Sequence, residues 1–417
     1  MSSDSSWSIS TLDNAADFIN GDRGKNYPSS SDYVASGIPF VSASDLDGRR
    51  IDLSGATFIS QGAYDRLGNG KIEQGDILFC LRGSLGKIGL AKGIQKGAIA
   101  SSLVIIRPKQ NVSRDFLYYI LSGSTGKTIA RELDNGSVQG NLSVRELKQV
   151  EIDLPSPQEQ KAIAHILGTL DDKIELNRKT NETLEAMAKA LFKSWFVDFD
   201  PVRAKAEGRS TGLPAEISDL FPDSFEDSEL GEIPSGWEVG GLEEFLVLQR
   251  GFDLPASQRI KGAYPVVAAS GVSGTHNEPM AFAPGVVTGR SGVLGKVFYI
   301  QTDFFPLNTT LWAKEFRLAT PIYGYFLLCD IDFAVFNAGS AVPTLNRNHL
   351  GSLRFLLPPK ALVVSFTDVA VDLMKKKEGI VAETSNLSAT RDALLPKLIS
   401  GEIRIPDAEK MLEEVGV

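Results

Sequence analysis

An internal duplication constrains the fold of this 417-residue chain more than any other feature. A glycine–serine pair followed by two leucines recurs at a shift of 203, with Gly136-Ser137, Leu142 and Leu147 matching Gly339-Ser340, Leu345 and Leu350. Further upstream, RGSLGK (Arg82–Lys87) is matched by RSGVLGK (Arg290–Lys296), which pairs the arginines and the lysines at their ends. Because these features recur in the same order, we predict two tandem copies of one structural unit.

Each copy begins with a globular segment. Short apolar runs bounded by glycine, such as GDILFCL and SSLVIIRP in the first copy and PVVAAS and KVFYI in the second, are typical of strands. Residues 115–123 and 321–330 read as short helices among them. We therefore predict a mixed α/β domain in each copy, over residues 1–155 and 231–358.

A long helix follows the first domain, over residues 156–197. Ser156 suits the N-cap, Pro157 the first helical position, and Glu159 completes a capping box. Apolar residues then recur at alternating three- and four-residue steps, as in a coiled-coil seam, at Ile163, Ile166, Leu170, Ile174, Leu184 and Leu191. Asn177 and Asn181 occupy the middle turns of this seam.

The second copy repeats the helix over residues 359–404, with Gly401 as its stop signal. Its seam is predicted at Phe366, Val369, Leu373, Leu387, Leu394 and Leu398. Between the copies lies an acidic, proline-containing connector, residues 198–230, and residues 405–417 are predicted as a tail.

The predicted fold class is α+β: two tandem mixed α/β domains separated by two long helices. We expect these helices to form an antiparallel intramolecular coiled coil with pseudo-two-fold symmetry, because each can bury its stripe on the other. Two alternatives remain open. Each helix packs on its own domain, or the helices pair between two chains.

Composition excludes several classes of protein. No apolar run approaches the roughly 20 residues that a membrane span needs, and the polar N-terminus does not resemble a secretory signal. Two cysteines cannot build a disulfide framework, and with three histidines they show no zinc-site spacing, so a reducing, cytoplasmic location is expected. The net charge of −9 does not exclude DNA binding, because residues 1–157 carry 17 basic and 17 acidic side chains and residues 231–360 carry 10 of each.

Two segments resemble a known family. LPSPQEQKAIAHILGTLDDKIELNRKTNETLEAMAKALFKSWF (Leu154–Phe196) is similar to the central conserved region of Type I restriction–modification specificity subunits, and RDALLPKLISGEIRI (Arg391–Ile405) to their distal conserved region. The order of domain, helix, domain and helix also matches. One departure is the start of the second helix, LPPKALVVSF, which lacks the glutamine- and glutamate-rich start of the first.

The resemblance implies two target-recognition domains, each reading one half of a split, asymmetric site in double-stranded DNA. The helices would set the interval between the half-sites and bind two methyltransferase subunits, and restriction subunits would join this complex. S-adenosylmethionine, ATP and Mg²⁺ would be bound by those partner subunits, and no cofactor or metal by this chain. The chain is therefore expected to be a non-catalytic, DNA-binding subunit without membrane contact.

Candidate DNA contacts are basic and amide residues near turns, since arginine, lysine, asparagine and glutamine bind phosphates and base edges. In the first domain they are Lys25, Arg49, Arg50, Arg82, Lys87, Gln139 and Asn141. In the second domain they are Arg250, Arg290, Lys296, Asn346 and Arg347. For any one of these residues the alternative is a solvated surface charge, and the repeated pairs could also serve the fold.

Two other functions remain open. A coiled-coil scaffold whose paired domains bind proteins would show the same repeat. An enzyme acting alone is disfavoured, because the sequence contains neither an Asn-Pro-Pro-Tyr methylation motif nor a glycine-rich S-adenosylmethionine loop.

Overall fold

The computed structural model describes residues 7–123, 126, 128, 141–336, 344–345, 350–414 and 416. It divides into two compact units. Unit 1 comprises Met1–Arg178 and Val381–Val417, and unit 2 comprises Lys179–Ile380. Each unit therefore contains one globular domain together with one half of each long helix.

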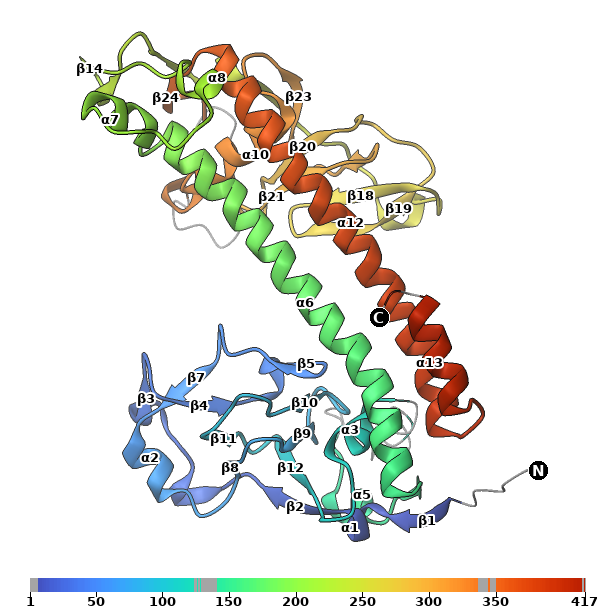
Figure 1. Cartoon of the computed structure of the whole chain (residues 1–417). Coiled ribbons are helices and arrows are strands. Elements are labelled where there is room, and N and C mark those ends of the chain that lie inside the picture. Colours follow the sequence, from blue (N-terminus) through green and yellow to red (C-terminus); the bar gives the residue numbers. More distant parts are fainter. Residues whose placement is uncertain are drawn as a thin grey trace. The chain divides into compact units, whose positions relative to one another are not determined.

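A four-stranded antiparallel sheet forms the centre of the unit 1 domain (Figure 1). Its order is β10 (Ile88–Leu90), β9 (Ile77–Cys80), β12 (Leu103–Pro108) and β2 (Ala16–Asn20). Successive side chains of β9 enter different apolar cores, Ile77 and Phe79 on one face and Leu78 and Cys80 on the other. Both faces are covered, which explains why the strand is apolar at every position.

The short helix α3 (Arg114–Ser122) lies against β10 and β12 and contacts the long helix through Tyr119 (Figure 1). A second, five-stranded sheet has the order β3 (Tyr33–Val34), β7 (Thr57–Ile59), β4 (Ile38–Val41), β11 (Gly97–Ile99) and β8 (Lys71–Ile72). The domain is completed by β1 (Ser8–Thr11), β13 (Glu151–Leu154), α1 (Leu12–Ala15), β5 (Leu46–Asp47), β6 (Arg50–Ile51), α2 (Gln61–Arg66) and α5 (Val144–Lys148), with the 3₁₀ turns η1 (Gly24–Asn26), η2 (Ser30–Asp32) and η3 (Ala43–Asp45).

Unit 2 repeats the strand order of the central sheet and the parallel pair of the second sheet, which confirms the duplication, although its second sheet has three strands instead of five. Its central sheet has the order β21 (Val297–Ile300), β20 (Gly285–Gly289), β23 (Thr310–Phe316) and β17 (Leu246–Arg250), covered by α10 (Pro321–Asp330). The parallel pair β18 (Tyr264–Ala268) and β22 (Phe305–Pro306) corresponds to β4 and β11. The remaining counterparts are α9 (Leu242–Phe245), β16 (Glu238–Gly241) and β24 (Arg354–Leu357); β19 (Gly271–His276), η4 (Ala256–Gln258) and η5 (Phe333–Phe336) complete the domain.

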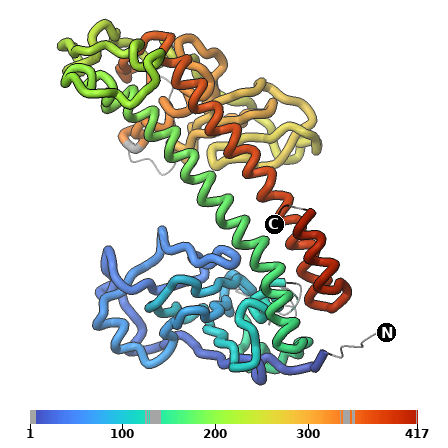
Figure 2. The backbone as a smooth tube through the Cα atoms, in the orientation of Figure 1, coloured from blue at the N-terminus to red at the C-terminus, as the bar shows by residue number. Residues whose placement is uncertain are grey.

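The two long helices are α6 (Pro157–Phe196) and α12 (Lys360–Ile399), and their paths can be followed in Figure 2. The predicted capping box is confirmed: the Ser156 amide donates to a Glu159 carboxylate oxygen (3.1 Å), and the Glu159 amide donates to Ser156 Oγ (3.3 Å). Gly401 follows α12 with a φ of 71°, which suits the predicted helix stop.

Polar contacts show that α6 and α12 are antiparallel within each unit. In unit 1, Arg391 contacts Asp171 (2.8 Å), and Glu383 contacts Lys173 (3.3 Å) and Asn177 (2.9 Å). In unit 2, Lys377 contacts Glu185 (2.5 Å). Residue numbers fall along α12 as they rise along α6, so the predicted intramolecular antiparallel pairing is confirmed.

The predicted seam is mostly correct. Buried members are Ile163, Ile166, Leu170, Phe366, Leu387, Leu394 and Leu398, and half-buried members are Ile174, Leu184, Leu191 and Leu373. Val369 was predicted wrongly, because its side chain is 38% exposed while its neighbour Ala370 is fully buried. The helix presents Ala370, with Phe366 and Met374 at four-residue steps, to the core.

The helices bury their stripes on the domains as well as on each other. In unit 1, residues of α6 and α12 share one core with α3 and the central sheet. In unit 2 that core is rich in aromatic rings, with Phe192 of α6 5.6 Å from Phe366 of α12 and 6.1 Å from Phe326 of α10 between ring centroids. Each long helix therefore packs against the domains and also pairs with the other helix.

Two segments are more ordered than the sequence indicated. The predicted tail contains α13 (Ile405–Glu414), whose Ala408 and Leu412 are buried in the core of unit 1. The predicted connector contains α7 (Asp200–Ala206), α8 (Ala215–Ser218) and, continuing beyond it, the hairpin of β14 (Phe225–Ser228) and β15 (Gly231–Pro234). Its Val202 and Phe221 are buried in the core of unit 2.

Gln160 explains the glutamine-rich start of α6. Its side chain is 1% exposed; Nε2 donates to the Pro155 carbonyl (2.9 Å), and Oε1 accepts from the Ser113 amide at the N-cap of α3 (2.8 Å). In the second copy the shift of 203 places buried Val363 at this position, and the α10 N-cap residue Thr320 instead contacts Thr367 (2.7 Å). The glutamine therefore serves the fold.

We expect Gln160→Ala to destabilise unit 1 by about 1–3 kcal/mol, because it leaves a partly buried amide and a buried carbonyl without their partner. Differential scanning calorimetry of the full chain should show a lower melting temperature for the transition that includes unit 1. Gln158→Ala is the matched control, since Gln158 is exposed on the same helical turn. Equal melting temperatures for the two variants would refute this role.

Candidate nucleic-acid interface

Two equivalent glycine turns present the strongest candidate residues. The Gly83 turn (residues 82–87) joins β9 to β10, and the Gly292 turn (residues 291–296) joins β20 to β21. Gly83 and Gly86 have φ values of 80° and 74°, and Gly292 and Gly295 have 85° and 76°. A residue with a side chain is strained at such positive φ values. Glycine at these positions therefore gives the two turns the same backbone shape.

Backbone hydrogen bonds correct the predicted alignment of these turns by one residue. The Leu81 and Arg290 carbonyls both accept from the leucine amide of a following segment, Leu142 (2.9 Å) and Leu345 (2.8 Å) respectively. The lysines do correspond, because the carbonyls of Lys87 and Lys296 accept from the last residues of β9 and β20. Arg290 is therefore the counterpart of buried Leu81, and Arg82 is the counterpart of Ser291.

The mismatch has a simple origin. RGSLGK aligns without a gap on SGVLGK (residues 291–296), and the arginine before Ser291 belongs to the end of the strand. Arg82 is exposed, whereas Arg290 is half-buried. The two arginines do not occupy equivalent positions.

Arg82 is held by an amide from a distant segment. Its Nε donates to Asn141 Oδ1 (3.2 Å), and the backbones of the two residues form an antiparallel bridge. Ser291 and Thr344 form the same bridge in unit 2. The structure thus brings together two predicted residues, Arg82 and Asn141, that lie 59 positions apart in the chain.

The other exposed candidates lie on separate parts of their domains. Lys87 reaches the Ala43 carbonyl (3.5 Å) from the Gly83 turn, and Lys296 is exposed at the matching place in unit 2. Lys25 is exposed on η1, and Arg250 ends β17 beside Asp253 (3.6 Å). Gln139, Asn346 and Arg347 lie outside the described residues.

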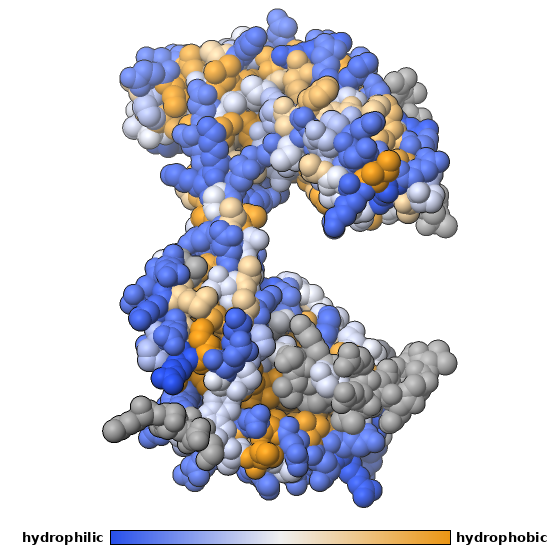
Figure 3. All heavy atoms as spheres, turned by 90° about the vertical axis from the view of Figure 1, so that its right-hand side faces the viewer, coloured by the Kyte–Doolittle hydropathy of each residue, from blue (hydrophilic) through white to orange (hydrophobic). Residues whose placement is uncertain are grey.

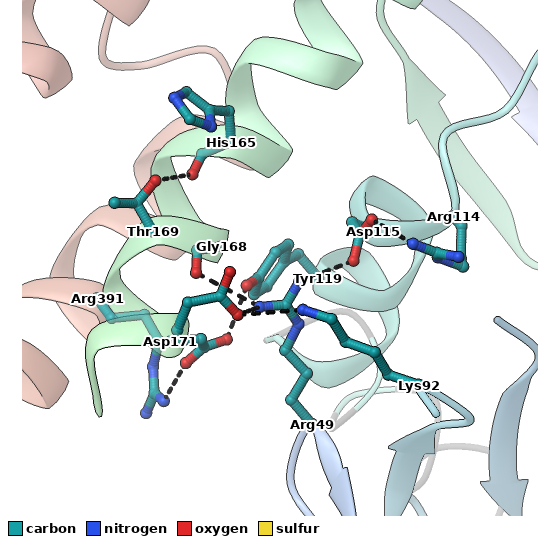
Figure 4. Close-up of polar contacts among 11 residues, drawn as sticks. Arg49, Lys92, Arg114, Asp115, Tyr119, His165, Gly168, Thr169, Asp171 and Arg391 are labelled. Atoms are coloured by element: carbon teal, nitrogen blue, oxygen red, sulfur yellow. Dashed lines mark hydrogen bonds and ion pairs between the residues drawn. The ribbon is translucent and has the colours of Figure 1, made fainter. Parts of the chain in front are cut away.

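Arg49 is engaged within the fold, unlike the exposed candidates. Its side chain is 16% exposed; it pairs with Asp115 of α3 (2.8 Å) and with Asp172 of α6 (3.0 Å), and its guanidinium lies 5.8 Å from the Tyr119 ring centroid (Figure 4). Two carboxylates already neutralise this arginine. Arg50, on the same hairpin, pairs with Asp47 (3.3 Å) and Asp52 (3.1 Å).

Asp171 extends this group of side chains, which we call the Arg49 cluster: Arg49, Asp115, Tyr119, Asp171, Asp172 and Arg391. One Asp171 oxygen accepts from the Tyr119 hydroxyl (2.7 Å), and the other accepts from Arg391 of α12 (2.8 Å). Figure 4 shows these side chains converging from the β5–β6 turn, α3, α6 and α12. The cluster therefore joins the unit 1 domain to both long helices.

The ionisation states of Asp115 and Tyr119 are the ones that these contacts require. Burial alone would raise the pKa of Asp115, but the hydrogen bond from Arg49 and the charges of Arg114 and Arg49 outweigh it, and the pKa lies below its ordinary value. Burial and the negative charge of Asp171 raise the pKa of the Tyr119 hydroxyl, which stays protonated and donates.

Sequence reasoning missed this cluster because its members are far apart in the chain. Asp171 and Arg391 do lie in the two segments that carried the family resemblance, and both face inward at the helix pairing. Among the described residues, no group of three or more His, Cys, Asp or Glu side chains is placed to hold a metal ion. No helix in the described part of the chain has the length and apolar character to cross a membrane.

Residues 5–186 match the family described as Type I restriction modification DNA specificity domain. The MjaIX specificity subunit of a Type I restriction enzyme from Methanocaldococcus jannaschii is 27% identical over 404 residues, covering 90% of this chain and 89% of that protein. The HindI specificity subunit from Haemophilus influenzae is 26% identical over 411 residues, covering 80% and 87%.

A crystal structure of a Type I restriction–modification system S subunit from M. genitalium is similar in fold, with a TM-score of 0.58 and 18% identity. The match covers 95% of this chain and 97% of that one. This likeness confirms the predicted fold class.

We expect Arg49→Ala to destabilise unit 1 by about 2–4 kcal/mol, because Asp115 would remain largely buried without its main partner. Hydrogen–deuterium exchange of the α3 amides measures this as a lower free energy of opening. Arg50→Ala is the control from the same hairpin, and its more exposed pairs predict a change of about 1 kcal/mol or less. Unchanged protection of α3 in Arg49→Ala would contradict the proposed contact.

The lowered pKa of Asp115 predicts a pH dependence. A carboxylate whose folded pKa is depressed adds stability above its unfolded pKa, about 3.9, and that stability is lost as the pH falls through the folded value. Asp115→Asn should therefore be less stable than wild type at pH 7, and the difference should narrow below about pH 4. Exchange protection of α3 between pH 7 and pH 3 measures this difference. A constant difference over this range would exclude the ionic contribution.

Proposed function

We propose that each of the two domains of this chain reads one half of a bipartite, asymmetric DNA site, because the chain is similar over most of its length to specificity subunits of Type I restriction enzymes. The observation that carries this division is the repeated architecture, since both domains have the same strand order in the central sheet and the same glycine turn. Two copies of one scaffold with different surface side chains suit two different half-sites.

The long helices would hold the two readers at a constant interval. Each helix is one uninterrupted element of 40 residues with residues in both units. At about 1.5 Å per residue, such a helix is about 60 Å long, a length comparable to about 17 base pairs. Dimeric DNA-binding proteins obtain half-site spacing from the same kind of fixed separation.

We further propose that this chain supplies recognition and that partner subunits supply the chemistry. The family resemblance assigns adenine methylation with S-adenosylmethionine to two methyltransferase subunits, and ATP-driven restriction with Mg²⁺ to further subunits, all acting on DNA in the cytoplasm. The sequence of this chain supports that division, because it contains no Asn-Pro-Pro-Tyr methylation motif. A protein-binding scaffold is the competing function, and the DNA-binding test below separates the two.

The surface character agrees with a polar ligand. On the face drawn in Figure 3, hydrophilic residues cover much of the surface, and hydrophobic residues gather in several areas between them. Exposed Lys87 and Lys296 project from the equivalent turns, where they suit phosphate contacts.

We expect Arg82→Ala, assembled with the methyltransferase, to weaken DNA binding about tenfold, as loss of one specific contact does. Gel shifts with duplexes scrambled in one half-site should show that this variant has lost discrimination in one half only. Arg209→Ala, an exposed arginine of the connector, is the control and should bind as wild type does.

Equal loss of discrimination in both halves for this variant would refute the division of labour. Absence of salt-sensitive duplex binding by the wild-type complex would favour the protein-binding scaffold instead.

A further inference from the structure

We propose that positions 82 and 141 in unit 1, and their counterparts 291 and 344 in unit 2, are the side-chain pairs that set one base preference in each half-site. This inference rests on the proposed function and assigns specificity to particular atoms. The positions are occupied by Arg82 and Asn141 in one domain and by Ser291 and Thr344 in the other.

The equivalence of the two pairs follows from the backbone. Both pairs are antiparallel bridges between a glycine turn and the segment just before Leu142 or Leu345. Each bridge is followed by the same hydrogen bond, from that leucine amide to the carbonyl at the strand end. The scaffold is thus alike in both domains, while the side chains it presents differ.

Arg82 and Asn141 together form a surface of hydrogen-bond donors. The bond from Arg82 Nε occupies Asn141 Oδ1 and orients the guanidinium, which leaves the two Nη groups and the Asn141 amide nitrogen without partners among the described residues. A guanidinium fork fits the O6 and N7 acceptors of guanine, which lie side by side in the major groove. We therefore assign a guanine to this contact in the half-site read by unit 1.

Ser291 and Thr344 have a different chemistry. Hydroxyl groups both donate and accept hydrogen bonds, so they can bind more than one base. A threonine methyl group can also pack on the methyl group of thymine. The half-site read by unit 2 should therefore lack a strict guanine requirement at the corresponding contact.

The neighbouring lysines provide an internal comparison. Lys87 and Lys296 are identical at equivalent, exposed positions of the two turns, although the two domains are proposed to read different sequences. An identical charge in both copies suits the phosphate backbone, which carries no sequence information, whereas the pair that differs suits the bases.

The test is to map methylated sites for the double variant Arg82→Ser/Asn141→Thr in the assembled complex with its methyltransferase. We expect methylation of sites without the guanine to rise about tenfold or more relative to wild type, in one half-site only, with the other half and the interval unchanged. The reciprocal variant Ser291→Arg/Thr344→Asn should gain a guanine preference in the other half-site. Arg82→Lys is the second variant if the double variant does not fold. It keeps the positive charge but lacks the guanidinium fork, so it should relax the guanine requirement in the same half-site.

Lys87→Ala is the matched control. It should lower methylation of all sites alike and reduce the salt dependence of binding, with every base requirement retained. If the wild-type sites are bipartite but Arg82→Ser/Asn141→Thr and Arg82→Lys retain every base requirement, this inference is wrong and the proposed function stands. If wild-type sites form one uninterrupted sequence, the proposed function itself fails.

Discussion

The structure of each unit depends on one short helix that packs between a central sheet and the paired long helices. In unit 1 this helix is α3, and the Arg49 cluster connects it to both α6 and α12 through charged hydrogen bonds. In unit 2 it is α10, which meets the same two helices mainly through aromatic rings, with Phe326 5.8 Å from Phe366 and Tyr323 5.0 Å from Phe196 between ring centroids. The same architecture is therefore held by two kinds of interaction, one sensitive to carboxylate protonation and one based on buried apolar area.

This difference matters for the candidate interface. Arg49 and Arg50 lie in a hairpin that is adjacent to β10, the strand that follows the Gly83 turn, and the Leu90 amide donates to the Arg49 carbonyl (3.3 Å). Their guanidinium groups form ion pairs with carboxylates of unit 1, so these arginines stabilise the fold of the domain. Arg82, Lys87 and Asn141 are the predicted residues that remain exposed at that turn in the described part of unit 1. A net charge of −9 is thus compatible with DNA recognition, because a few placed cations suffice where others are used internally.

Comparison of the two copies distinguishes the features that build the backbone scaffold from the side chains that are proposed to read DNA. The positive-φ glycines of the turn, the strand order of the central sheet and the bridge positions are the same in both domains, because they define the backbone of the turn. The side chains on that backbone differ, as two different half-sites would require. Gln160 and Val363 show the same principle in the core, where an amide network in one copy is replaced by apolar packing in the other.

The sequence by itself determined the repeat, the two long helices with their caps, and most of their buried stripe, since these depend on local spacing and residue type. It could not establish that Arg49 is buried beside Asp115 and Asp172, or that Arg82 aligns with Ser291, because these facts depend on contacts between distant segments. Val369 shows the same limit: a heptad pattern placed it in the seam, but the helix also packs against a domain, and that rotates Ala370 into the core. The helical tail was missed for a related reason, since α13 is a short helix that is stable only where unit 1 covers Ala408 and Leu412.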